Sequence, residues 1–239
     1  MDITQLIVSA DINLSRTLID FAEDHRIVHA IAKVGANLPE AKGVIVVLVF
    51  WFLWFAPNPN FRDRRFTLAS ILCVAIIAIA AGRMLANTLP FRFRPLATPE
   101  VMAGEVESSR FLGEWSSMPS DHAILFFALA TGIFLISHRV GVVMFLHAAI
   151  VVCLSRVLLG LHFVTDVLVG AVIGIILGLV LVPLIARGLR WLASRSPGIM
   201  RVVTRPEIGY PVIFFVTYEF ATMFNGARLI LRGLSNLLS

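Results

Sequence analysis

Two histidines, two arginines and an aspartate occur in short strings whose residue types suit the transfer of a phosphoryl group. The strings are Arg94-Pro95, then Pro119-Ser120-Asp121-His122, and Ser155-Arg156 followed by His162 and Asp166. Arginine neutralises phosphate oxygens with paired N–H donors, and histidine can attack phosphorus or carry a proton. The three strings therefore predict a site for phosphoryl transfer.

The spacing of His162 and Asp166 assigns roles to the two histidines. These residues are four positions apart, so on one helix their side chains share a face. A carboxylate bonded to one imidazole nitrogen fixes the tautomer and leaves the other nitrogen free to attack. We expect His162 to be the nucleophile. His122 is then expected to protonate the leaving oxygen and afterwards to activate the water that hydrolyses the phosphohistidine.

The expected anion site combines cations, a hydroxyl group and helix N-termini. Arg94 and Arg156 are predicted to clamp the phosphate oxygens with help from Arg92, and Ser120 is predicted to donate its hydroxyl. Backbone N–H groups at helix starts near residues 121 and 162 add positive dipole ends. No metal and no cofactor are expected, because the sequence has no carboxylate cluster typical of a divalent cation site.

The composition indicates a membrane protein. The chain has 239 residues, of which 58% are hydrophobic and 15% charged, and its mean hydropathy is +0.88, too apolar for a soluble domain. Cys73 and Cys153 lie in separate apolar runs, which argues against a disulfide framework or a zinc site. The net charge of +5 comes with arginines beside apolar runs, so anionic lipid headgroups are the expected partners and nucleic acid is not.

Hydrophobic runs predict an all-α integral membrane bundle of five to six spans with amphipathic terminal helices. The pattern at residues 1–40 indicates an amphipathic helix on the membrane that leads into a partial or complete first span. The expected catalytic core is 41–190, and 191–239 is expected to form an interfacial or re-entrant helical segment. The five strong segments are approximately 41–56, 66–86, 121–137, 141–158 and 163–186.

Loop arginines predict the orientation, because short cytoplasmic loops are enriched in Lys and Arg. Arginines are concentrated in 57–65, at 139 and after residue 186, regions that share one side of the membrane by parity. That side is expected to be the cytoplasm. Every candidate chemical residue then falls on the opposite face, so the prediction is a multi-pass protein of the cell inner membrane with its site facing the periplasm.

The strings resemble the motifs of the type 2 phosphatidic acid phosphatase superfamily. That family has a Lys, six residues and Arg-Pro, then Pro-Ser-Gly-His, then Ser-Arg, five residues, His, three residues and Asp. Ser155, Arg156, His162 and Asp166 match the third motif in full, and the resemblance covers about residues 41–186. It implies a metal-independent phosphatase that forms a phosphohistidine and acts on a lipid phosphate in the bilayer.

Two departures from the family pattern bear on the substrate. Asn87 occupies the lysine position and can hydrogen-bond a phosphate without neutralising it, so Arg83 or Arg92 could compensate. Asp121 replaces glycine, and the Pro-Ser-Asp-His form is similar to undecaprenyl-diphosphatase-like members. The resemblance therefore favours a polyprenyl diphosphate of the undecaprenyl type, with phosphatidic acid, phosphatidylglycerol phosphate and lipid A as alternatives.

A different class of function also stays open. Asn87 would suit a relative that binds or transports lipid phosphates without hydrolysing them, although all the residues needed for covalent chemistry are present. A haloperoxidase of the same superfamily would be soluble, which five spans contradict. Gly170, Gly174 and Gly178 recur every four residues, which indicates close helix packing and not a nucleotide-binding loop.

Overall fold

The described part of the chain is helical apart from short connections. A computed structural model describes residues 3–99, 101, 116–196 and 205–222. These residues contain no strand, which confirms the predicted all-α class. The elements are α1 (Ile3–Asp24), α2 (Arg26–Asn37), the π-helical η1 (Glu40–Val44), α3 (Ile45–Phe55), α4 (Phe61–Thr88), the 3₁₀ turn η2 (Pro95–Ala97), α6 (Asp121–Ile136), α7 (His138–Leu146), the π-helical η3 (His147–Leu154), α8 (Ser155–Leu158), α9 (Val164–Arg195) and α11 (Pro206–Ala221).

The long helices have the composition of a membrane bundle, as predicted. Three helices of the described residues are long and apolar enough to cross a bilayer: Phe61–Thr88, the continuous His138–Leu158, and Val164–Arg195. A fourth span results if α2 and the η1–α3 helix count as one, although they are bent by 74°. The predicted total of five is reached only when the shorter apolar helix α6 is included.

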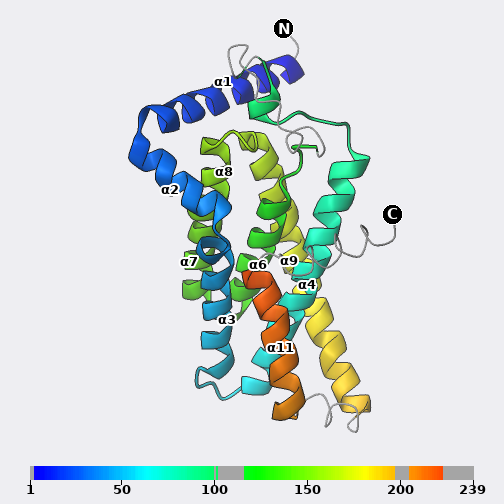
Figure 1. The fold of residues 1–239 in the computed structure, drawn as a ribbon. Coiled ribbons are helices and arrows are strands. Elements are labelled where there is room, and N and C mark those ends of the chain that lie inside the picture. The colour runs from blue at the N-terminus through cyan, green and yellow to red at the C-terminus, as the bar shows by residue number, and fades with distance from the viewer. Residues whose placement is uncertain (1–2, 100, 102–115, 197–204, 223–239) are drawn as a thin grey trace, which may run out of the picture.

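Pro39 explains the bend between α2 and α3. A proline disfavours helical geometry in the residue before it, and Leu38 has φ −80° and ψ 116°, an extended conformation that ends α2. In Figure 1, α1 crosses one end of the bundle and α2 descends from it towards α3. The N-terminal segment is thus a helix lying across the bundle end followed by a bent pair.

Helix α6 packs against α4, α7 and α9 in the centre of the bundle (Figure 1). Its contact with α9 depends on the glycine stripe predicted from the sequence. A Cβ atom on Gly174 would lie 2.4 Å from the carbonyl oxygen of Ile124, and Cβ atoms on Gly170 and Gly178 would lie 2.7 and 2.6 Å from atoms of α6 or its N-cap. Only hydrogen fits there, so the stripe brings the two helix backbones together.

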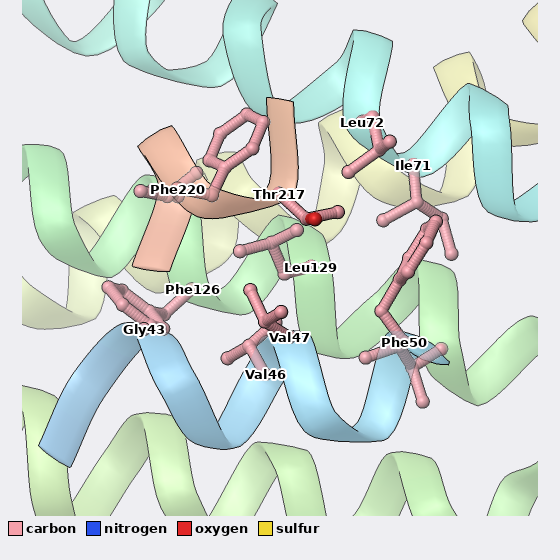
Figure 2. A pocket seen from close by; sticks show the side chains of 12 residues that line it. Gly43, Val46, Val47, Phe50, Ile71, Leu72, Phe126, Leu129, Thr217 and Phe220 are labelled. Atoms are coloured by element: carbon pink, nitrogen blue, oxygen red, sulfur yellow. The ribbon is translucent and has the colours of Figure 1, made fainter. Parts of the chain in front are cut away.

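An apolar pocket lies between η1, α3, α4, α6 and α11. Figure 2 shows Thr217 and Phe220 of α11 on one side of it and Val46, Val47 and Phe50 of α3 on another. None of the predicted site residues lines this pocket. Its lining residues are Gly43, Val46, Val47, Phe50, Ile71, Leu72, Leu125, Phe126, Leu129, Ile133, Thr217 and Phe220.

Candidate active site

The predicted catalytic residues gather where α8 and the first turns of α6 and α9 meet. His122 is the second residue of α6, Arg156 belongs to α8, and His162 lies in the short connection between α8 and α9. Helix α1 crosses this end of the bundle and contacts α8 and α9 (Figure 1). The structure therefore joins residues that are up to 72 positions apart in sequence, from Arg94 to Asp166.

His162 is held in one tautomer by a backbone carbonyl. Its Nδ1 lies 2.9 Å from the carbonyl oxygen of Ser117, and because a carbonyl oxygen only accepts, Nδ1 carries the hydrogen. The other ring nitrogen, Nε2, is buried and has no hydrogen-bond partner among the described residues. Burial lowers the pKa of His162 below its ordinary value of 6.5, and the Asp166 carboxylate opposes that shift. A neutral ring with a free Nε2 lone pair is the form that a nucleophile requires.

Asp166 lies beside His162, but the two residues do not share one helix as predicted, because His162 precedes the start of α9. The strongest bonds of Asp166 go elsewhere. Its Oδ2 is 3.8 Å from His162 Nδ1, while the same oxygen accepts from the Ser117 hydroxyl and from the backbone N–H of Phe163 at 2.8 Å. Ser117 thus contacts both the ring and the carboxylate. The sequence analysis missed Ser117, although it stands three residues before Ser120 of the second motif.

His122 also has a carboxylate partner, supplied by the residue that departs from the family motif. Its Nδ1 lies 2.8 Å from Oδ1 of Asp121, and the second carboxylate oxygen of Asp121 lies 3.3 Å from Arg83 Nη2 on α4. Arg83, which the sequence analysis named as able to compensate for Asn87, makes an ion pair with Asp121 here. Asp121 consequently orients the imidazole of His122 at the start of α6.

Arg94 and Arg156 bring two buried guanidinium groups to the same place. Arg94 is 7% exposed and its Nη1 donates to the carbonyl of Leu161 at 3.3 Å. Burial lowers the pKa of Arg94, and the Asp121 and Asp166 carboxylates oppose that shift. Arg156 is also 7% exposed and follows the π-helical η3; its Nε has no hydrogen-bond partner among the described residues. Buried cations are costly unless an anion compensates them, so this pair favours an anionic ligand.

Ser120 and Asn87 occupy different environments. Ser120 is fully buried and caps α6, where its Oγ accepts from the Ala123 N–H at 3.5 Å. Its own N–H donates to the carbonyl of Asp166 at 3.1 Å, which ties the starts of α6 and α9 together. Asn87 is exposed in the last turn of α4. Phosphate binding by either side chain stays a prediction.

Arg92 lies between two carboxylates. Its Nη1 is 2.6 Å from Oδ1 of Asp166 and its Nη2 is 2.6 Å from Oδ2 of Asp11. The guanidinium carbon also lies 4.0 Å from the ring centroid of Phe163. Direct binding of a substrate phosphate by Arg92 stays a prediction, and in this structure both terminal nitrogens serve carboxylates of the protein.

The carboxylate of Asp11 was not predicted as part of the site. The pattern at residues 1–40 predicted an amphipathic helix on the membrane, and Asp11 of this helix is buried against Arg92 and Thr165. No local sequence signal links these positions.

His, Cys, Asp and Glu side chains of the described residues nowhere form a group of three or more placed to hold a metal ion; catalysis without metal stays a prediction.

Comparison with known proteins places the matched region around these residues. Residues 89–190 match the family model described as the PAP2 superfamily. The chain is also similar to the bacitracin transport permease protein BcrC of Bacillus licheniformis, with 28% identity over 134 residues that cover 54% of this chain and 58% of the relative. The chain thus spans less than two thirds of the length of that curated relative.

Among solved structures, the crystal structure of Aquifex aeolicus LpxE resembles this chain. The alignment covers 70% of this chain and 92% of that one, with 22% sequence identity and a TM-score of 0.44.

Proposed function

Because residues 89–190 match the family model described as the PAP2 superfamily, we propose that this chain is a membrane phosphatase that cleaves a lipid phosphate through a phosphohistidine. The observation that carries the proposal is the free, buried Nε2 of His162, whose Nδ1 donates to the Ser117 carbonyl. The positive charges of Arg156 and Arg94 act on this ring. A nucleophilic nitrogen beside two buried cations suits attack on a phosphoryl group.

In the first step the Nε2 lone pair of His162 bonds to phosphorus as the bond from phosphorus to the leaving oxygen breaks. Protonated His122, stabilised by Asp121, gives its proton to that oxygen. Arg94 and Arg156 neutralise the non-bridging oxygens, which carry the charge of the transition state. The lipid leaves with the former bridging oxygen, and the phosphoryl group stays on His162.

In the second step water replaces the lipid. His122 accepts a proton from the water as its oxygen bonds to phosphorus and the bond to His162 Nε2 breaks. Inorganic phosphate leaves, His162 is neutral again and His122 is protonated for the next cycle.

Activity is expected to survive EDTA, because arginines and helix N-termini neutralise the phosphate here; loss on chelation with recovery in Mg²⁺ would contradict this mechanism.

The substrate proposed is a polyprenyl diphosphate of the undecaprenyl type. The Pro-Ser-Asp-His form of the second motif supports it by resemblance, and hydrolysis would release polyprenyl phosphate and inorganic phosphate. Phosphatidic acid, phosphatidylglycerol phosphate and lipid A are the alternatives. The test offers all four to the purified protein in detergent and measures phosphate release; the prenyl diphosphate is expected to turn over fastest, and a clear preference for a glycerolipid or lipid A would reject the prenyl assignment.

A phosphohistidine can be trapped directly. Rapid quenching with ³²P-labelled substrate should give protein-bound label that is stable in base and labile in acid, and His162→Ala should lose it. Label that persists in His162→Ala would mean another nucleophile.

A second candidate function is binding or transport of a lipid phosphate without hydrolysis. Two observations favour it: Asn87 in place of the family lysine, and the name of the relative from Bacillus licheniformis, a transport permease protein. Substrate-dependent phosphate release that vanishes in His162→Ala would exclude it. Retention of lipid binding with no phosphate release by the unmodified protein would establish it.

The location proposed is the cell inner membrane with the site facing the periplasm. In a variant without Cys73 and Cys153, a cysteine at exposed Pro99 should react with an impermeant thiol reagent in intact spheroplasts. A cysteine at exposed Arg62, in the first turn of α4 at the opposite end of that helix, should react only after lysis. The reverse pattern would invert the topology.

A further inference from the structure

Asp11 of α1 is a buried carboxylate with both oxygens engaged at the start of α9. Oδ1 accepts from the Thr165 N–H at 3.1 Å. Oδ2 accepts from the Thr165 hydroxyl and pairs with Nη2 of Arg92 at 2.6 Å. One turn further along α1, Ser15 Oγ accepts from the Val164 N–H at 3.4 Å. The side chain of Asp11 is 3% exposed, so these bonds are sheltered from water.

These contacts cap α9 from a distant segment of the chain. The first N–H groups of a helix lack partners within the helix and are usually satisfied by the residue just before it. Here that residue is Phe163, which has no side-chain acceptor. Asp11 and Ser15 accept from two of these N–H groups, and the negative charge of Asp11 also favours the positive end of the helix dipole. The first turn that they fix contains Asp166.

Arg92 extends the connection from Asp11 to the nucleophile. Its two terminal nitrogens bridge the carboxylates of Asp11 and Asp166, and Nη1 also donates to the Thr165 hydroxyl at 2.8 Å. Asp166 in turn accepts from Ser117, whose carbonyl holds His162 Nδ1. An unbroken series of hydrogen bonds thus runs from α1 to the attacking imidazole.

We propose that Asp11 is a positioning residue for phosphoryl transfer. His162 is then correctly oriented only when α1 is packed against the start of α9. The inference rests on the proposed function. Without the Asp11 carboxylate, Asp166 is the one carboxylate of the described residues that still pairs with Arg92, and Arg92 is expected to pull it away from Ser117. Other residues of α1 are apolar and exposed, at Ile3, Leu6, Ile7 and Leu14, so the same helix that is expected to meet the lipid also holds the catalytic carboxylate.

The kinetic test measures the rate of ³²P-phosphohistidine formation in the full-length protein reconstituted in lipid nanodiscs. Asp11→Asn should slow this rate about 10- to 100-fold, the usual cost of losing an outer partner of a functional group, with KM changed less than about twofold. Asp11→Glu should recover part of the rate. Asp20→Asn is the matched control, since Asp20 lies on the same helix, is exposed and, within the described part of the chain, pairs with Arg16 alone at 3.8 Å; it should behave as the unmodified protein.

A double-mutant cycle separates positioning from general stability. If Asp11 acts through Arg92, adding Asp11→Asn to Arg92→Ala should cost little further rate. Fully additive losses, or a wild-type phosphorylation rate in Asp11→Asn, would overturn the proposal.

A spectroscopic measurement needs no turnover. Nitrogen-15 NMR of histidine-labelled protein should show a protonated Nδ1 and a bare Nε2 for His162, and a mixture of tautomers in Asp11→Asn. An unchanged His162 signal in Asp11→Asn would overturn the positioning role even if hydrolysis is observed. Absence of any phosphohistidine in the unmodified protein would overturn the proposed function instead, while the NMR result would still report on the link from Asp11 to His162.

Discussion

In its first turn, α6 carries Asp121 and His122, which make short directional hydrogen bonds, whereas one to two turns later Leu125, Phe126 and Leu129 line the apolar pocket of Figure 2. At the polar end His122 pairs with Asp121, and Asp121 pairs with Arg83 of α4. In the apolar region the side chains make packing contacts, which depend on shape and volume. The same helix therefore serves orientation at one end and packing along the rest.

This contrast separates two kinds of failure. A substitution at the polar end should remove activity from a protein that still folds, because it alters a few bonds and little volume. A substitution in the helix contacts should reduce the folded fraction while the surviving molecules keep their rate. The contrast between the two regions would be wrong if one substitution reduced both the activity per folded molecule and the folded fraction.

The largest effect is expected at His162. In His162→Asn the side-chain amide can still donate to the Ser117 carbonyl, but no nitrogen remains to attack phosphorus. Phosphate release should fall by at least about a thousandfold, with a small change in thermal unfolding. His138→Asn, at an exposed position on α7, is the control. A large fall in the unfolding temperature would show that His162 is mainly a packing residue.

A smaller loss is expected for Arg156→Lys. The charge is kept, but the planar guanidinium that can hold two phosphate oxygens is lost. We expect kcat to fall about a hundredfold, in the range for losing one donor to a developing charge, and inhibition by orthovanadate to weaken in parallel. Equal activity of the two proteins would mean that charge alone is sufficient at this position.

The packing half of the contrast is tested at Gly174 of α9. Its added Cβ would meet the backbone oxygen of Ile124 at 2.4 Å, so Gly174→Ala should destabilise the fold by about 1–3 kcal/mol through overpacking. Phosphate release per folded molecule should change little. Gly188→Ala is the matched control, because no atom of the described residues lies within 4 Å of its added Cβ. The comparison is read from thermal unfolding in detergent.

The smallest effect concerns pH. The attacking form of His162 is neutral. Burial lowers the pKa of His162 below 6.5, and the charges of Arg156 and Arg94 lower it further. The carboxylates of Asp166 and Asp121 oppose this shift. The acidic limb of kcat/KM against pH should therefore lie below 6.5. From pH 7 to pH 6 the loss should be smaller than the roughly threefold loss of an unperturbed histidine. An acidic limb above 6.5 would mean that the Asp166 carboxylate affects the pKa of His162 more than burial does.

Local spacing was sufficient to predict the central residues of the site. The four-residue spacing of His162 and Asp166 predicted that they lie close together, and span parity predicted that His122, Arg94 and Arg156 reach the same end. Hydrophobic runs predicted the helices, since lipid exposure imposes a strong compositional signal. Boundaries were less certain: the predicted last span ends at 186, whereas α9 continues to Arg195.

The residues missed by sequence reasoning act through tertiary contacts. Asp11 and Thr165 are 154 positions apart, and no periodicity joins them. The apolar–acidic pattern of α1 correctly predicted a helix, but it gave no reason to place one acid inward. Asp121 was read as a family departure and proved to be the partner of His122, a relation that only the first turn of α6 establishes.

The π-helical η3 has a consequence for the length of the chain itself. A π-helical turn holds one residue more than the α-helical register would, and such turns often occur at functional sites. In a regular α-helix, deleting one residue rotates everything beyond it by about 100° about the helix axis. Because the π-helical turn already holds a surplus residue, deleting an exposed residue of η3 such as Ile150 should relax the segment to an α-helix and keep Arg156 at the site. The segment before Arg156 is therefore expected to tolerate the loss of one residue.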